Sequence, residues 1–316
     1  MTSALDLVAR LDQRMLAPGS VHRYAAIRLA LAVVVAGRVV LGPYARLADS
    51  PPAVFDPPTV LSWLPAMPDL PVIVAVQVIG LIGAALVVAR GSRGGFALAW
   101  ASLLVLAGLR TSVGKIMHND VLLLVTCLPL IFGPPAARLF DRRRTSAAGW
   151  PVRAAALLMA LVYFWAGVQK LRFSGIGWVT GENMRWTVYQ ATRTPLPKTD
   201  ALSFFIGDRP WLASTLAGGA LGLELTSPLL LVHRWGRVLF VVGAACLHTS
   251  IYATLGLDYW GWILTVAIVL APWDRWGAGR ADEQGSAVAR RSTAPVGVLW
   301  ADGHDRHLEA PRPPGG

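Results

Sequence analysis

The chain has 316 residues, of which 54% are hydrophobic and only 15% are charged, with a formal net charge of +11. This composition is outside the range of soluble globular proteins and typical of a polytopic membrane protein. The positive charge is attributed to cytoplasmic loops that face anionic lipid, so a nucleic-acid partner is not expected. The lipid bilayer itself is the first expected partner.

The N-terminal segment, residues 1–21, is expected to lie on the cytoplasmic surface of the membrane. Within it, Leu5, Val8, Leu11 and Met15 recur at helical spacing with charged residues between them. This pattern is typical of a short amphipathic helix in the membrane interface. No apolar core followed by a small-residue cleavage site is present, so a removable signal peptide is not expected.

Eight apolar segments follow, and each is predicted to be a membrane-spanning helix, because about 20 apolar residues suffice to cross the bilayer core. Their approximate bounds are 24–44, 70–88, 95–108, 121–132, 154–171, 211–232, 238–255 and 259–273. The fourth is short for a core about 30 Å thick, so a tilted or partly re-entrant helix is an alternative there. The predicted fold class is therefore all-α, a helical bundle in the membrane.

Loop charge predicts the orientation of this bundle. The loops after the second, fourth and sixth segments are rich in arginine, whereas the alternate loops hold fewer basic residues and several acids. Because basic loops stay in the cytoplasm, both termini are expected there. The transmembrane domain is assigned to 22–275, with a long outer loop at 172–210. Residues 276–316 are rich in Arg, Ala, Gly, Ser, Asp and Pro and are expected to form a disordered cytoplasmic tail.

Lys170 stands out at the end of the fifth segment. Only three of the 29 Lys and Arg residues are lysines, namely Lys115, Lys170 and Lys198. An ammonium at the bilayer centre costs roughly 2.5 to 3.5 kcal/mol, so an intramembrane lysine is a functional candidate unless it reaches the headgroups. A simpler interpretation is that the Lys170 side chain, like that of Arg172 beside it, extends to the lipid headgroups.

Three further ionisable residues lie in or next to predicted spans: His118, Glu224 and His248. On the predicted topology they and Lys170 are able to line one outward-facing cavity. Each also has a purely structural interpretation. His118 is then a loop residue, Glu224 a partner for an intramembrane arginine such as Arg38, and His248 a packed core residue.

The functional interpretation is acid–base chemistry on a lipid-soluble molecule. An amine in a partly apolar pocket loses its charge more easily and becomes a usable base. Tyr163, Gly167 and Lys170 share one helical face, and Gly167 allows a flat ligand or a neighbouring helix to come close. The sequence shows no hydrolase, Walker or Rossmann motif and no metal-ligand spacing, so a metal is not expected. The two cysteines, Cys127 and Cys246, lie in apolar runs and are expected to be core residues rather than a disulfide.

The run YFWAGVQKLRFSGIGWVTGENM, residues 163–184, resembles a conserved stretch of the membrane half of the vitamin K-dependent gamma-carboxylases. The segments KIMHNDVLLL, LGLELTSPLLL and CLHTSIY are similar, more weakly, to the histidine and acidic helices of those enzymes. Over about residues 20–275 the chain resembles most closely the bacterial horizontally transferred transmembrane (HTTM) proteins. A bacterial plasma-membrane protein is therefore expected.

The resemblance implies roles for the residues singled out above. Lys170 and His118 occupy the positions of the base toward reduced vitamin K and of the histidine that assists it, and a reduced naphthoquinone becomes the expected cofactor. The substrate-binding residues implied or suggested by their positions are Tyr163, Gly167, Trp178, Glu224 and His248. Two departures limit the analogy: the large extracytoplasmic domain of the carboxylases has no counterpart here, and Gln169 replaces a second lysine. Protein carboxylation is therefore not expected.

A different class of function is also compatible with the sequence. The chain is then a non-catalytic partner or maturation factor for a secreted peptide or a thiol oxidoreductase. The outer loop 172–210 would be the docking surface, and Trp178, Glu182, Arg185 and Trp186 would matter more than Lys170. A transporter is less favoured, because no internal inverted repeat is visible.

Overall fold

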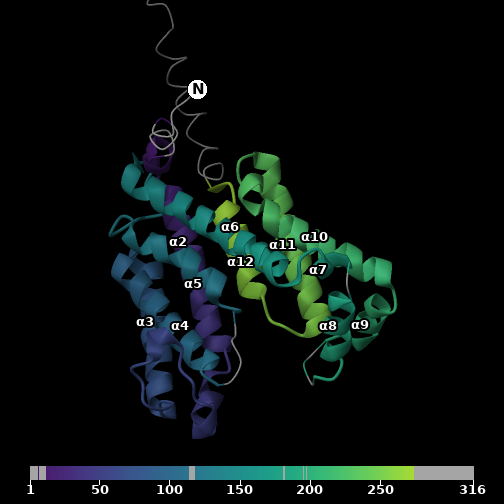
Figure 1. Ribbon diagram of the computed structural model, residues 1–316. Coiled ribbons are helices and arrows are strands. Elements are labelled where there is room, and N and C mark those ends of the chain that lie inside the picture. Colours follow the sequence, from purple (N-terminus) through teal and green to yellow (C-terminus); the bar gives the residue numbers. More distant parts are fainter. Residues whose placement is uncertain are drawn as a thin grey trace, which may run out of the picture. The chain divides into compact units, whose positions relative to one another are not determined.

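The computed structural model describes Asp6 and residues 12–113, 118–180, 182–194, 196 and 198–273. In chain order the elements are β1 (Gly19–Ser20), α2 (Val21–Leu41), η1 (Tyr44–Asp49), η2 (Pro52–Val54), η3 (Thr59–Leu61), α3 (Leu70–Arg90), α4 (Arg93–Thr111), α5 (Val121–Cys127), η4 (Leu128–Phe132), β2 (Arg144–Thr145), α6 (Ser146–Ser174), α7 (Gly177–Thr180), α8 (Asn183–Ala191), α9 (Asp200–Gly207), α10 (Pro210–Leu230), α11 (Arg234–Leu255) and α12 (Trp260–Leu270) (Figure 1). The chain divides after Asp274. The predicted tail 276–316, Lys115 and most of the predicted amphipathic helix lie outside the described residues, although 12–16 are helical.

All eight predicted apolar segments are helical, which confirms the all-α class. In the described part of the chain, five helices are long and apolar enough to cross a membrane by length and composition, namely α2, α3, α4, α6 and α11. The runs Val121–Phe132 and Trp260–Leu270 are apolar but shorter. Helix α10 has 21 residues but is not one of the five, because Glu224 and several Gly, Ser and Thr residues lower its hydropathy. The long apolar helices indicate an integral membrane protein.

Polar caps and glycines set the ends of these helices. The side chains of Ser20, Ser92 and Thr145 accept hydrogen bonds from the backbone at the starts of α2, α4 and α6, which satisfies amide groups that have no partner within the helix. Gly91, with φ of 59°, ends α3, and Gly256, with φ of 68°, ends α11. Both adopt the left-handed conformation that glycine adopts most easily. The short links that follow connect α3 to α4 and α11 to α12.

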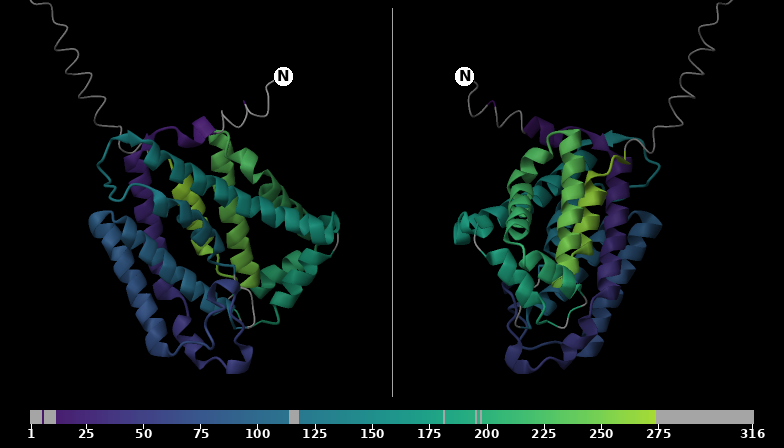
Figure 2. Two further views of the ribbon diagram at one scale, coloured as in Figure 1. Left: turned by 60° about the vertical axis from the view of Figure 1, so that its left-hand side comes forward. Right: turned by 90° about the vertical axis from the view of Figure 1, so that its right-hand side faces the viewer.

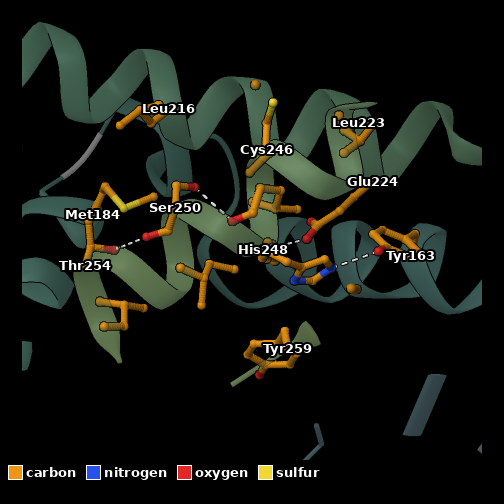
Figure 3. Close-up of a pocket in the computed structure, with 18 of the residues that line it drawn as sticks. Tyr163, Met184, Leu216, Leu223, Glu224, Cys246, His248, Ser250, Thr254 and Tyr259 are labelled. Carbon is orange, nitrogen blue, oxygen red and sulfur yellow. Dashed lines mark hydrogen bonds and ion pairs between the residues drawn. The ribbon is translucent and has the colours of Figure 1, made fainter. Parts of the chain in front are cut away.

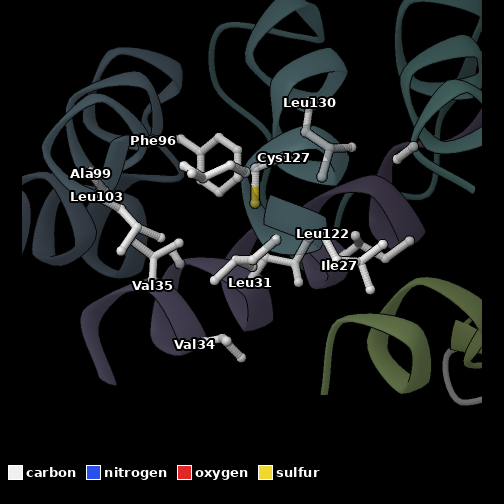
Figure 4. Packing of buried hydrophobic residues seen from close by; sticks show 14 of the residues in the cluster. Ile27, Leu31, Val34, Val35, Phe96, Ala99, Leu103, Leu122, Cys127 and Leu130 are labelled. Carbon is white, nitrogen blue, oxygen red and sulfur yellow. The ribbon is translucent and has the colours of Figure 1, made fainter. Parts of the chain in front are cut away.

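The main core is formed around α2, α3, α4 and α5. Figure 4 shows Ile27 and Leu31 of α2 packed among buried side chains of the neighbouring helices, including Phe96 and Leu103 of α4. Helices α3 and α4 approach closely at Gly83, which has no side chain. A Cβ atom there would lie 2.6 Å from the backbone of α4. Figures 1 and 2 show α2, α3 and α4 side by side, with α6, α10 and α11 as a second group.

Several segments meet at the end of the bundle where α2, α4 and α6 begin. Strands β1 and β2 pair antiparallel there, and Ser92 bridges to Ala136. Arg153 of α6 donates hydrogen bonds to the carbonyl oxygens of Met15 and Ala17 at 2.9 and 2.6 Å. This end carries arginine-rich loops, which the sequence analysis expects on the cytoplasmic side.

The segment predicted as the outer loop, 172–210, is largely helical. It contains the end of α6 and the short helices α7, α8 and α9. Val188 of α8, Ile206 of α9 and Ala213 of α10 form a small hydrophobic cluster of their own. The segment therefore packs against α10 as an ordered helical layer, which gives the cavity described below one of its walls.

Candidate functional site

A cavity of about 910 Å³ lies among α6, α7, α8, α10, α11 and α12. Helices α10 and α11 contribute the greatest part of its lining, from Thr215 to Leu230 on one and from Leu239 to Leu255 on the other. Most of these side chains are apolar. Among the polar side chains of the lining, Tyr163 of α6, Glu224 of α10 and His248 of α11 lie near one another (Figure 3). We call this space the Lys170 cavity.

Lys170 and Glu224 form an ion pair at the wall of this cavity. The Nζ atom of Lys170, near the end of α6, donates a hydrogen bond to Oε1 of Glu224 in α10. The side chain of Glu224 is 7% exposed and that of Lys170 is 24% exposed. The ammonium also lies 5.1 Å from the centre of the Trp178 ring, within range of a cation–π interaction. Two charges that would be costly separately are therefore placed together.

Gly167 explains how α6 and α10 come close enough for this pair. A Cβ atom at Gly167 would lie 3.0 Å from Cδ2 of Leu225 and 3.1 Å from Cβ of Glu224. Gly167 therefore contacts a neighbouring helix, which is one of the two possibilities that the sequence leaves open. Gly167 is not among the residues that line the cavity, so the structure does not support a direct contact between Gly167 and a substrate.

Tyr163 and His248 make a second buried contact in the cavity wall. Oη of Tyr163 and Nε2 of His248 are 2.8 Å apart (Figure 3). The imidazole ring also packs against Tyr259 and Trp262, each with its ring centre 5.1 Å away. These aromatic contacts hold the His248 ring in one orientation. If Tyr163 donates to Nε2, the imidazole carries its own proton on Nδ1.

Three buried polar atoms of the lining residues have no hydrogen-bond partner among the described residues. They are Oε2 of Glu224, Nδ1 of His248 and Nε1 of Trp178. Buried polar atoms in proteins nearly always have a partner, because leaving one unpaired costs about 1–3 kcal/mol. One acceptor, one indole donor and one imidazole nitrogen are therefore able to bind the polar end of a molecule whose remainder is apolar.

The structure thus brings six of the seven sequence-predicted site residues to one cavity: His118, Tyr163, Lys170, Trp178, Glu224 and His248. His118 takes part differently from the others. Its side chain is exposed, and its backbone carbonyl accepts a hydrogen bond from Nε1 of Trp262 at 3.3 Å. No hydrogen bond joins its imidazole to Lys170 in the described part of the chain, so the structure gives no direct support for an assisting role.

Arg38 is paired elsewhere, and the suggested Arg38–Glu224 pair is wrong. Its guanidinium binds Asp120 at 2.6 Å and Asp258 at 2.6 Å. Asp120 occupies the N-cap position of α5, but its side chain makes no cap hydrogen bond. Arg38 therefore has two carboxylate partners, and these ion pairs join α2 to the start of α5 and to the link between α11 and α12.

Sequence reasoning missed the wall contributed by α8 and α9. Met184, Thr187, Val188 and Ile206 line the cavity, although the sequence suggests a docking surface for this segment. Their apolar spacing within a hydrophilic stretch was the available signal. Most of the proposed docking residues make contacts with other residues of the same chain. Trp178 lies beside Lys170, and Arg185 pairs with Glu182 and donates to the Gly207 carbonyl, while Trp186 remains 60% exposed.

The polar contacts outside the membrane-spanning helices include one between α8 and the residue after α9. Tyr189 donates a hydrogen bond to Oδ1 of Asp208 at 2.7 Å, and this bond is the main cause that raises the pKa of Tyr189. The contact ties α8 to the end of α9. Across the described residues, no group of three or more His, Cys, Asp or Glu side chains is placed to hold a metal ion.

Comparison with known proteins finds no relative of this chain. The chain matches no family model, no curated protein and no solved structure. The resemblance seen in the sequence is therefore supported only by the residues that carry it, and the function has to be argued from the cavity itself.

Proposed function

We propose that the chain is an HTTM-type protein of a bacterial plasma membrane that performs acid–base chemistry on a lipid-soluble substrate in the Lys170 cavity. The observation that carries the proposal is the Lys170–Glu224 pair, with Oε2 of Glu224 unpaired, in an otherwise apolar cavity. The proposal includes eight membrane-spanning helices with both termini in the cytoplasm. On that topology the end of α6, and with it Lys170, lies toward the outer face.

The pair is suited to moving one proton. If the ammonium of Lys170 passes its proton to the Glu224 carboxylate, a neutral amine and a carboxylic acid result, and the total charge of the pair does not change. The neutral amine then accepts a proton from a substrate hydroxyl, which restores the ammonium and leaves the substrate as an oxyanion. Low polarity favours the neutral form of the pair, because it removes two desolvated charges.

The shape and polarity of the cavity favour a flat, mainly apolar substrate with hydroxyl or carbonyl groups at one end. Its volume of about 910 Å³ is within the usual range for small-molecule sites. A reduced naphthoquinone fits this description, because its hydroxyls are able to pair with Glu224, His248 and Trp178 while its ring and tail contact α10 and α11. When bound, it supplies an acidic hydroxyl and an oxidisable ring.

The test uses the full chain in lipid nanodiscs with a reduced naphthoquinone in the presence of oxygen. Deprotonated hydroquinones react with oxygen faster than neutral ones, so oxygen uptake reports the proton transfer. We expect Lys170→Met to lower the protein-dependent rate at least tenfold, a change of about 1.4 kcal/mol in the barrier. Arg172→Met is the matched control, because Arg172 is an exposed cation two residues away.

Two results would contradict the proposal. One is an equal rate for the wild type and Lys170→Met. The other is a loss of the same size in the Arg172→Met control, which would indicate a general effect of surface charge. Binding of the oxidised quinone is measured separately by equilibrium dialysis. This measurement distinguishes loss of the catalytic base from loss of substrate binding.

A further inference from the structure

A second cavity, of about 580 Å³, lies at the opposite end of the bundle from the end of α6. It is formed by the first turns of α2, the last turn of α3 and the segment 137–140 after η4. Three arginines line it, namely Arg28, Arg90 and Arg138, and no aspartate or glutamate does. We call it the Arg28 cavity. Nothing in the proposed chemistry of the Lys170 cavity uses it.

Arg28 is the unusual member of this group because it is buried without a counter-charge. Arg28 is only 1% exposed. The guanidinium donates hydrogen bonds to Oη of Tyr24 at 2.9 Å, to the Pro134 carbonyl at 3.0 Å and to the Gly91 carbonyl. All three acceptors are neutral, and no carboxylate pairs with Arg28 within the described ranges. A buried charge is costly unless it is paired, so an anion at this position would be stabilised.

Arg90 and Arg138 extend the positive surface to the mouth of the cavity. Both are exposed, and their side chains make no hydrogen bond or ion pair to the described part of the chain. Arg93, at the start of α4, is close enough to act electrostatically on Arg28. Arginine is the side chain best suited to bind phosphate, because its planar guanidinium donates two parallel hydrogen bonds to two oxygens.

The rim of the cavity is apolar on the side of the helices. Leu29 and Val88 belong to helices that are long and apolar enough to cross a membrane, and Val88 is 61% exposed. Phe140, which is 93% exposed, stands beside them. The arginines therefore lie where these helices begin and end, with apolar surface directly adjacent. Phospholipid headgroups and the first part of their acyl chains occupy this depth in a bilayer.

We propose that the Arg28 cavity binds a phosphate group, and that its apolar rim favours an anionic phospholipid as the carrier. The phosphate contacts Arg90 and Arg138 directly and lies in the field of Arg28. The lipid joins α2 and α3 to the segment after η4. This inference does not depend on the proposed reaction.

The test measures lipid binding to the purified full chain in detergent micelles by native mass spectrometry. Dioleoyl-phosphatidylglycerol is the anionic probe, dioleoyl-phosphatidylcholine the zwitterionic one, and inorganic phosphate is added as a competitor at constant ionic strength. The decisive variant is R90Q with R138Q. Its matched control is R142Q with R234Q, which removes the same charge from exposed arginines that do not line the cavity.

We expect the wild type and the control to bind the first phosphatidylglycerol more tightly than phosphatidylcholine. The R90Q/R138Q variant should bind it about 30-fold more weakly, since each arginine near an anionic headgroup contributes about 1 kcal/mol. Competition by millimolar phosphate would assign the site to free phosphate, and lack of competition to the lipid headgroup; both results support a phosphate site. If R90Q/R138Q does not fold, R138Q alone is judged against R142Q alone by the same criterion. Equal affinity for the two lipids together with no phosphate binding would overturn the proposal, as would equal weakening in variant and control.

Discussion

Lys170 of α6 and Glu224 of α10 form an ion pair across a helix contact, although 54 residues separate them in the chain. The pair explains why both residues are tolerated in apolar helices, since each neutralises the other. Because the carboxylate is more deeply buried than the ammonium, loss of the lysine leaves the less tolerable single charge.

This asymmetry predicts the stability of single and double variants. Lys170→Met should lower the free energy of unfolding by about 3 kcal/mol, because it leaves the Glu224 carboxylate buried and unpaired. Lys170→Met combined with Glu224→Leu should recover most of that loss. Unfolding in mixed detergent micelles, followed by circular dichroism, measures both. Losses that simply add in the double variant would mean that the two groups do not interact.

The close contact at Gly167 predicts a steric effect on the same pair. Gly167→Leu should push α6 away from α10 and lower stability by about 1–3 kcal/mol, because the position has no room for a large side chain. Gly222→Leu on α10 is the control, since a Cβ atom at Gly222 would meet nothing within 4 Å. The thermal unfolding midpoint of both variants in micelles is the measurement. A midpoint for Gly167→Leu that equals the control would argue against tight packing here.

The Arg38 cluster predicts unequal effects for its two carboxylates. Asp120→Asn should destabilise the protein more than Asp258→Asn, because the Asp120 side chain is 5% exposed and that of Asp258 is 40% exposed. Removing a partner from a buried pair costs about 3–5 kcal/mol, whereas exposed pairs contribute about 0–1 kcal/mol. Unfolding free energies of the two variants decide it. The reverse order would show that Arg38 depends mainly on the link after α11.

The two free cysteines allow the Lys170 cavity to be probed chemically. Cys246 is exposed and lines the cavity, whereas Cys127 is fully buried in the main core. An apolar maleimide should therefore modify Cys246 and leave Cys127 unmodified. A naphthoquinone that occupies the cavity should slow this reaction at least threefold. Mass spectrometry of peptides from the wild type and Cys246→Ser gives the sites, and labelling that the ligand does not change would place it elsewhere.

A pH-dependent contact lies in the loop before β2. Hydrogen bonds from the Arg143 guanidinium lower the pKa of Asp141 to about 2. The folded-state value is below the unfolded one, so the contact stabilises the fold above the usual aspartate pKa and is lost as the pH falls toward 2. Arg143→Gln should raise the pKa of Asp141 toward its ordinary value. Carbon-13 titration of labelled aspartates measures the shift, Asp141→Asn assigns the signal, and Arg142→Gln should leave the signal unchanged.

The apolar segments were predictable because helix formation in a membrane depends on local composition. About 20 apolar residues in sequence satisfy the bilayer and their own backbone whichever helix lies beside them. The segments that were harder to predict from the sequence also have a local explanation. Helix α10 contains Glu224 and is less apolar than the five clear candidates, and α7 to α9 arise in a stretch whose average composition is hydrophilic.

The sequence by itself determined the helical class, the positions of the apolar segments and the presence of unusual charges at Lys170, Glu224 and Arg38. Only the tertiary structure decided which charges pair, because Arg38 does not bind Glu224, the partner that the sequence suggests, but two carboxylates that lie 82 and 220 residues away. It also decided that Gly167 contacts a helix rather than lining the cavity, and that Arg28, Arg90 and Arg138 line a second cavity. Pairing and cavity shape depend on how helices pack, and no local pattern of residues contains that information.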